Sequence, residues 1–166
     1  MATWIAFPIL SGLLILQTAI LSRVPLLQGT TDLVLLALIA WSLQKRVQTA
    51  WQWGIIGGLL VGFVSAVPFL AYPTGYLAVV GLSLLLRKRI WQVPILAMFI
   101  ATFLGTILVH LIAIVSLRLN GSVLPMFIST NQITLPSLLL NMLLAVPFFV
   151  LFGDLAGLLY PEELEI

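Results

Sequence analysis

The run VPILAMFIATFLGTILVHLIAIVSL, residues 93–117, contains no Asp, Glu, Lys or Arg, and it decides which solvent the chain faces. Apolar stretches of about this length cross the ~30 Å hydrocarbon core of a bilayer. The same bias extends through the chain, because 62% of its 166 residues are hydrophobic and 7% are charged. Soluble domains carry roughly a quarter of their residues as charged side chains. We therefore predict an all-α, polytopic integral membrane protein.

Six hydrophobic runs are separated by short polar breaks, so we predict a single domain, residues 1–166, of six transmembrane helices. The approximate spans are 4–22, 31–44, 53–68, 74–86, 93–117 and 135–160. A proline and a glycine in the stretch 72–75 favour a turn at the start of the fourth span. Little chain remains for loops, so no soluble catalytic domain fits.

The remaining composition argues against most chemistry. The chain has no cysteine, which excludes disulfides and cysteine metal sites, and its net charge of +2 is too small to indicate nucleic-acid binding. The single histidine and the few carboxylates form no catalytic triad, carboxylate pair, metal-ligand cluster or phosphate-binding loop. We expect a protein that is not an enzyme and needs no cofactor.

Basic residues set the expected orientation. Five of the seven follow the second and fourth spans, and the positive-inside rule places those loops in the cytoplasm. Both termini are then cytoplasmic too. All five tryptophans fall near the same boundary, where indole rings favour the membrane interface. They are Trp4, Trp41, Trp51, Trp53 and Trp91.

The third span carries small residues at Gly54, Gly58, Gly62 and Ala66, each four positions from the last. This spacing places them on one helix face, and glycine lets two backbones approach closely in lipid. Two interpretations stay open. The face packs against another span of the same chain, or it binds the transmembrane helix of a partner.

Four polar residues within the spans are expected to be structural. Asp32 begins the second span, and we expect it at the outer mouth, where a charge costs little. Asn141 should bond a neighbouring helix, and His110 should be neutral and internally bonded. Asp154 lies near the cytoplasmic end of the last span, where it can reach the interface.

Several stretches resemble the MreD family, the rod shape-determining membrane proteins of bacteria. They are Thr31-Asp32-Leu33-Val34-Leu35-Leu36, the glycine-rich run from Gly54 to Gly62, Tyr72-Pro73-Thr74-Gly75, and Leu135-Pro136 through Asn141 to Pro147. The resemblance implies a fold similar to the substrate-binding subunits of energy-coupling-factor transporters. It also implies a multi-pass protein of the bacterial cytoplasmic (inner) membrane.

Membership of that family implies a non-enzymatic scaffold of the cell-elongation machinery that helps to position peptidoglycan synthesis. The expected partner is MreC, a protein with one span and an external coiled coil. The wider complex would include MreB, RodA and a class B penicillin-binding protein. On this interpretation the Gly54, Gly58, Gly62 face and the outer loop near Phe127 hold the partner's helix. The apolar run 123–128 around Phe127 is expected to dip into the membrane or lie along its surface.

An alternative function is the substrate-binding subunit of an energy-coupling-factor transporter for a vitamin-like solute. The chain length, the six spans and the pair Ala2 and Ala6 are compatible with such a subunit. This alternative requires an outer pocket with converging polar groups. Candidates for them are Asp32, Arg118, Asn131 and Gln132. A structural subunit of some other membrane complex is a third possibility.

Overall fold

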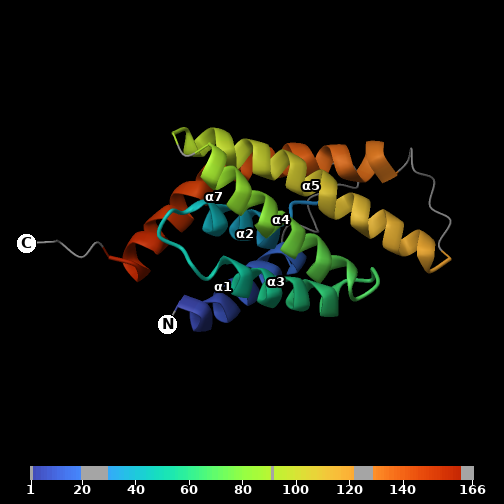
Figure 1. Cartoon of the computed structure of the whole chain (residues 1–166). Helices are drawn as coiled ribbons and strands as arrows, with labels where there is room; N and C mark the ends of the chain where they lie inside the picture. Colours follow the sequence, from blue (N-terminus) through green and yellow to red (C-terminus); the bar gives the residue numbers. More distant parts are fainter. Residues whose placement is uncertain (1, 20–29, 91, 122–128, 162–166) are drawn as a thin grey trace, which may run out of the picture.

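A computed structural model describes residues 2–19, 30–90, 92–121 and 129–161, and every regular element in these ranges is helical (Figure 1). The elements are α1 (Ala2–Ala19), α2 (Leu33–Leu43), α3 (Ala50–Val64), α4 (Ala71–Arg89), α5 (Pro94–Leu119), the π-helical turn η2 (Ser129–Thr134) and α7 (Leu135–Leu159). The predicted all-α class is confirmed. Two helical stretches, Pro94–Leu119 and Gln132–Leu159, are long and apolar enough to cross a membrane.

Two boundaries differ from the prediction around the connection between α3 and α4. Helix α3 ends at Val64 instead of 68, because Ser65 adopts extended backbone with ψ 147°. Helix α4 begins at Ala71, so the predicted turn at 72–75 is wrong. Pro73 is compatible with the first turn of a helix, where its missing N–H would have no intrahelical acceptor. Residues 20–22 of the predicted first span lie outside the described residues.

Helix α2 lies at the centre of the bundle and contacts α1, α3, α4, α5 and α7. All of its residues, Leu33–Leu43, are buried. Such a uniformly apolar helix is buried on every side because it has no polar face to present to water. The helices around it also contact one another in the order α1, α3, α4, α5, α7.

One end of the bundle carries most of the positive charge, and we call it the basic end. It contains Lys45, Arg46, Arg87, Lys88 and Arg89. The start of α1 lies here, because the Thr3 hydroxyl donates to Gln52 Oε1 over 2.8 Å at the start of α3. The end of α7 lies here too, since Arg46 Nη1 donates to the Tyr160 carbonyl over 3.3 Å.

The tryptophans near this end do not all face outward. Trp41 and Trp53 are fully buried and stack with ring centroids 4.3 Å apart. They form an aromatic core near the basic end, and the expectation that they lie at the level of a membrane interface stays a prediction. Trp4 and Trp51 are exposed, and Trp91 lies outside the described residues.

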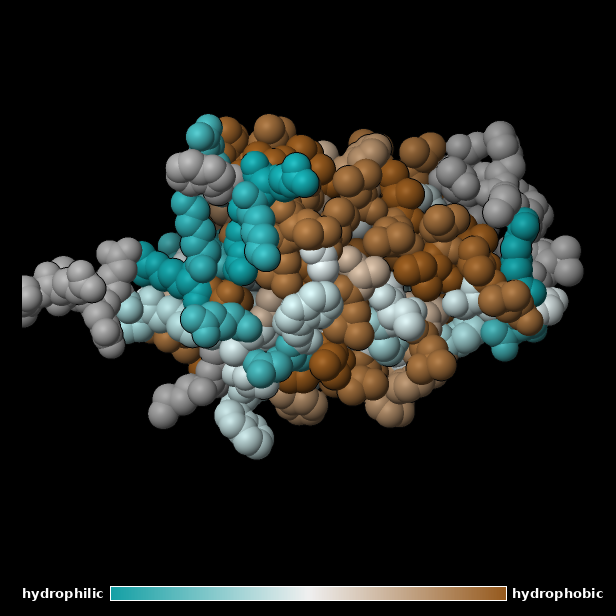
Figure 2. Space-filling view, viewed as in Figure 1, coloured by the Kyte–Doolittle hydropathy of each residue, from teal (hydrophilic) through white to brown (hydrophobic). Residues whose placement is uncertain are grey.

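The outer surface of the bundle is strongly apolar. Large hydrophobic side chains are exposed on five of the helices, among them Trp4 on α1, Phe63 on α3, Leu85 on α4, Leu111 on α5 and Leu143 on α7. Figure 2 shows hydrophobic residues across the middle of the face in view, with hydrophilic ones mainly toward the two ends. Soluble monomers seldom expose continuous apolar surface of this extent.

Candidate functional site: the polar cluster at the start of α2

The amino-terminal end of α2 lies inside the bundle, and side chains from four other helices meet it there. We call this group the polar cluster. It consists of Gln17, Asp32, Tyr76, Thr106, Ser137 and Asn141. The first amides of any helix lack intrahelical acceptors, so an end buried in this way needs acceptors from elsewhere.

Asp32 is the N-cap of α2. Its Oδ1 accepts the Leu35 N–H over 2.9 Å, which is the usual role of aspartate at this position. The hydroxyl of the fully buried Tyr76 in α4 donates to both carboxyl oxygens, at 2.8 Å from Oδ1 and 2.7 Å from Oδ2. A carboxylate accepts all of these bonds, and the positive end of the α2 dipole favours its negative charge.

Asn141 joins α7 to two further helices and is fully buried. Its Oδ1 accepts the Asp32 N–H over 2.9 Å, and its Nδ2 donates to Thr106 Oγ1 of α5 over 3.0 Å. The prediction that Asn141 bonds a neighbouring helix is confirmed. An unpaired amide at this depth would be costly, so both of its bonds stabilise the arrangement.

Two more side chains complete the cluster. Gln17 Oε1 of α1 accepts the Leu33 N–H over 2.9 Å, and Ser137 Oγ of α7 accepts the Thr30 N–H over 3.0 Å. The cluster thus connects α1, α2, α4, α5 and α7 through hydrogen bonds. Each member takes part in at least one of these hydrogen bonds, and such bonds are strengthened where the surroundings have a low dielectric constant.

Asp32 itself is half-buried, while the tyrosine that donates to its carboxyl group is fully buried. The hydrogen bonds of the cluster link α2 to α1, α4 and α7, and Asn141 extends the network to α5, so the cluster holds these helices together.

The glycine face of α3 is also used inside the chain. A Cβ at Gly58 would lie 2.6 Å from the Cα of Pro73, and one at Gly62 would lie 2.8 Å from the Phe69 carbonyl oxygen. A Cβ at Gly54 would lie 3.0 Å from a valine side chain of α4. The face packs against α4 and the segment before it, so the intrachain interpretation holds. The expectation that this face binds a partner's helix is wrong, because α4 already occupies the face.

The other predicted residues are placed apart from this face. Ala66 is exposed and lies beyond the end of α3, so it does not extend the glycine row. Asp154 is exposed on α7. Phe127, predicted to help hold the partner, lies outside the described residues.

His110 lies in the half of the bundle away from the basic end. Its Nδ1 is 3.0 Å from Thr134 Oγ1, so the expected internal bond is present. Both residues line a cavity of about 170 Å³ together with Tyr72 and mainly aliphatic side chains. Pockets for small organic ligands usually measure about 300–1,000 Å³, so this one is small for a vitamin.

Sequence reasoning did not find Tyr76 and Gln17. The available signal was their polarity within apolar runs, since a buried donor or acceptor nearly always has a partner. What could not be read from the sequence was which helix supplies the partner. Gly57 was missed in a similar way: it faces α2 and α1, where a Cβ would lie 3.1 Å from Val34.

No protein-family model, no curated protein and no solved structure matches the chain. The likeness to the MreD family and to transporter subunits therefore stays a prediction from the sequence motifs.

Proposed function

We propose that this chain is a six-span protein of the bacterial cytoplasmic membrane that acts as a non-enzymatic scaffold of cell elongation, as expected for an MreD-type protein. One observation carries the proposal. The bundle has an apolar exterior and, at the start of α2, a cluster of polar side chains that bond one another across five helices. Such a molecule is suited to presenting a rigid surface within lipid.

Membrane embedding is supported by the exposed apolar side chains. Phe63 is 78% exposed, Leu143 73% and Leu158 80%, so α3 and α7 present large hydrophobic groups outward. Exposing them to water would be unfavourable, at about 25 cal/mol per Å² of apolar surface. In a bilayer the same surface contacts acyl chains at no such cost.

The charge distribution supports an orientation. The basic end would face the cytoplasm by the positive-inside rule, and the start of α1 and the end of α7 lie at this same end. At 1.5 Å per residue, α2 carries Asp32 about 16 Å from that end, near the middle of a ~30 Å core. The hydrogen bonds of the polar cluster would then offset the cost of a carboxylate at this depth.

The orientation can be tested by labelling, because the chain contains no cysteine. Gln48→Cys introduces an exposed thiol at the basic end, and Asn120→Cys introduces one at the opposite end. A membrane-impermeant maleimide should label the first variant in inverted vesicles and the second in spheroplasts. Leu143→Cys, on the apolar exterior, serves as a control that neither preparation should label. If both end variants were labelled in the same preparation and in no other, the proposed orientation would be refuted.

The scaffold role needs a partner, for which we propose an MreC-like single-span protein. With the glycine face filled by α4, the partner's helix would contact the apolar exterior instead. Gentle extraction of the tagged chain from its own bacterium, followed by native mass spectrometry, tests this. A stoichiometric single-span protein with an external coiled coil supports the scaffold. A stoichiometric small solute without such a protein would refute it and favour the transporter subunit.

A further inference from the structure

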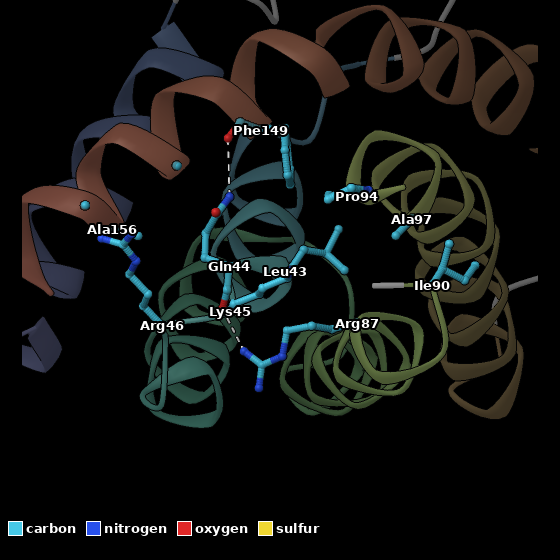
Figure 3. A pocket seen from close by; sticks show the side chains of 12 residues that line it. Leu43, Gln44, Lys45, Arg46, Arg87, Ile90, Pro94, Ala97, Phe149 and Ala156 are labelled. Atoms are coloured by element: carbon cyan, nitrogen blue, oxygen red, sulfur yellow. Dashed lines mark hydrogen bonds between the residues drawn. The ribbon is translucent and has the colours of Figure 1, made fainter. Parts of the chain in front are cut away.

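A cavity of about 310 Å³ opens at the basic end, away from the polar cluster (Figure 3). It lies between the end of α2, the end of α4, the first turn of α5 and the second half of α7. Its basic lining residues are Lys45, Arg46 and Arg87, and no carboxylate lines it within the described ranges. Asp154 neighbours Gly153 in sequence but is not part of the lining.

Arg87 is fixed in position at this cavity. Its Nη1 donates to the Gln44 carbonyl over 2.8 Å and to the Val47 carbonyl over 3.0 Å, which satisfies carbonyls just after the end of α2. A guanidinium group has five N–H donors in a planar fork. The group keeps its positive charge in these bonds, and Arg87 brings that charge to the wall of the cavity.

The first turn of α5 adds further positive character. Pro94 lines the cavity, and no side chain caps the helix at its N-cap residue Val93. Pro94 has no N–H, and the N–H of Ala97 donates to the Val93 carbonyl, so this helix end contributes its partial positive charge to the cavity and no amide donor. The cations and this helix end therefore act on the same space.

Apart from the polar Gln44, the other walls are apolar or carry no side chain. Leu43, Ile90 and Phe149 line the cavity beside Ala97 of α5, and α7 contributes Gly153, Ala156 and Gly157. In Figure 3 Arg46 extends toward α7 near Ala156 and Arg87 lies beside Lys45, while Pro94, Ala97 and Ile90 lie on the other side of the space. An occupant that fits has an anionic head and an apolar body.

We propose that this cavity binds an anionic phospholipid of the cytoplasmic leaflet, with its phosphate between Arg87 and the first turn of α5. The inference rests on the proposed membrane embedding and orientation. Basic pockets between membrane helices on the cytoplasmic side recognise such head groups. The apolar walls select a lipid over free phosphate, because they would remain unfilled by an inorganic anion.

The test compares lipids that differ only in the head group. The full chain, purified in detergent, is titrated with phosphatidylglycerol and with phosphatidylethanolamine of identical acyl chains, and bound lipid is counted by native mass spectrometry. We expect phosphatidylglycerol to bind on the order of 100-fold more tightly, at about 1 kcal/mol for each of the three basic residues of the cavity. Excess inorganic phosphate should not displace it, and displacement would overturn the assignment to a lipid.

Two pairs of neutralised cations give a matched comparison. Lys45→Gln with Arg46→Gln removes two charges at the cavity, and we expect the preference for phosphatidylglycerol to fall by roughly 10- to 30-fold. Lys88→Gln with Arg89→Gln removes two exposed charges that do not line it, and the preference should persist. Equal loss in both double variants would overturn the proposal, since only overall charge would then matter.

A steric variant tests the cavity without changing its charge. Gly153→Leu places a side chain toward it, where a Cβ would meet only Gln44 at an ordinary 3.6 Å. We expect this variant to retain no phosphatidylglycerol, while its midpoint of thermal unfolding stays that of the wild type. Retention by this folded variant would refute the site. Carbonate extraction of the wild-type chain separates the two proposals. If carbonate releases the chain from membranes, the proposed membrane embedding is refuted. If the chain stays in the membrane but shows no lipid preference, only the lipid site is refuted.

Discussion

The substitution Gly58→Ala tests the close packing of α3 on α4 most directly. The added Cβ would lie 2.6 Å from the Cα of Pro73 and 3.2 Å from its nitrogen. Both are backbone atoms, so no rotamer change can relieve the contact. Carbon atoms attract best at about 3.5–4.0 Å, so the two backbones would have to separate by about 1 Å.

The expected magnitude follows from two opposing effects. Overpacking a tight contact costs about 1–3 kcal/mol, and the upper part of this range applies because the obstacle is backbone. Replacing glycine by alanine within a helix stabilises the folded state by about 1 kcal/mol. We therefore expect a net destabilisation of about 2 kcal/mol, which lowers the midpoint of thermal unfolding by about 4–8 °C for a chain of this size.

The assay is thermal unfolding of the purified chain in detergent, followed by tryptophan fluorescence. The buried, stacked pair Trp41 and Trp53 should report loss of packing. Gly12→Ala is the matched control, because a Cβ there meets nothing within 4 Å, and it should unfold no earlier than wild type. If the Gly58→Ala and Gly12→Ala variants have the same midpoint of thermal unfolding, the contact between α3 and α4 is not as tight as described.

Three substitutions in and near the polar cluster are measured in the same assay. Tyr76→Phe removes the donor to the Asp32 carboxyl group and should destabilise by about 1.5–3 kcal/mol, the range for a hydrogen bond to a charged group; an unchanged midpoint would contradict that bond. Thr106→Val leaves Asn141 Nδ2 without its acceptor and should cost about 1 kcal/mol. Thr102→Val should be neutral or stabilising, because the buried Thr102 hydroxyl has no hydrogen-bond partner among the described residues. If Thr102→Val lowers the stability as much as Thr106→Val does, the Thr102 hydroxyl has a hydrogen-bond partner after all.

Most of the helical architecture could be predicted from hydrophobic runs, because a long apolar stretch has few alternatives to a helix. Boundaries failed where local backbone chemistry decided them. Ser65 ends α3 in extended conformation, and Pro73 lies in the first turn of α4 instead of in a loop turn. Proline is compatible with both structures, so the sequence signal at this position was ambiguous.

Individual polar residues were easier to single out than to pair. Asn141 was expected to bond another helix because a buried amide must, and it does. The pairing of Tyr76 with Asp32 depends on how α4 crosses α2, which no periodicity encodes. The same limit applies to the glycines: four-residue spacing identified a close approach but could not distinguish α4 from a partner's helix.

The short length of α2 connects these observations. Because only Leu33–Leu43 are helical, the start of α2 falls inside the bundle, and its amides must be satisfied there by side chains. The acceptors come from Asp32 itself and from α1 and α7, while α4 and α5 bond the Asp32 carboxyl group and Asn141 in turn. These bonds fix the helices around the centre, and α3 is held by glycine contacts with α4. Since the interior groups are thereby committed, a partner in the membrane could bind only at the exterior, where it would replace lipid. Its affinity would then depend on shape and packing against a rigid surface, because lipid provides no hydrophobic drive for helix association.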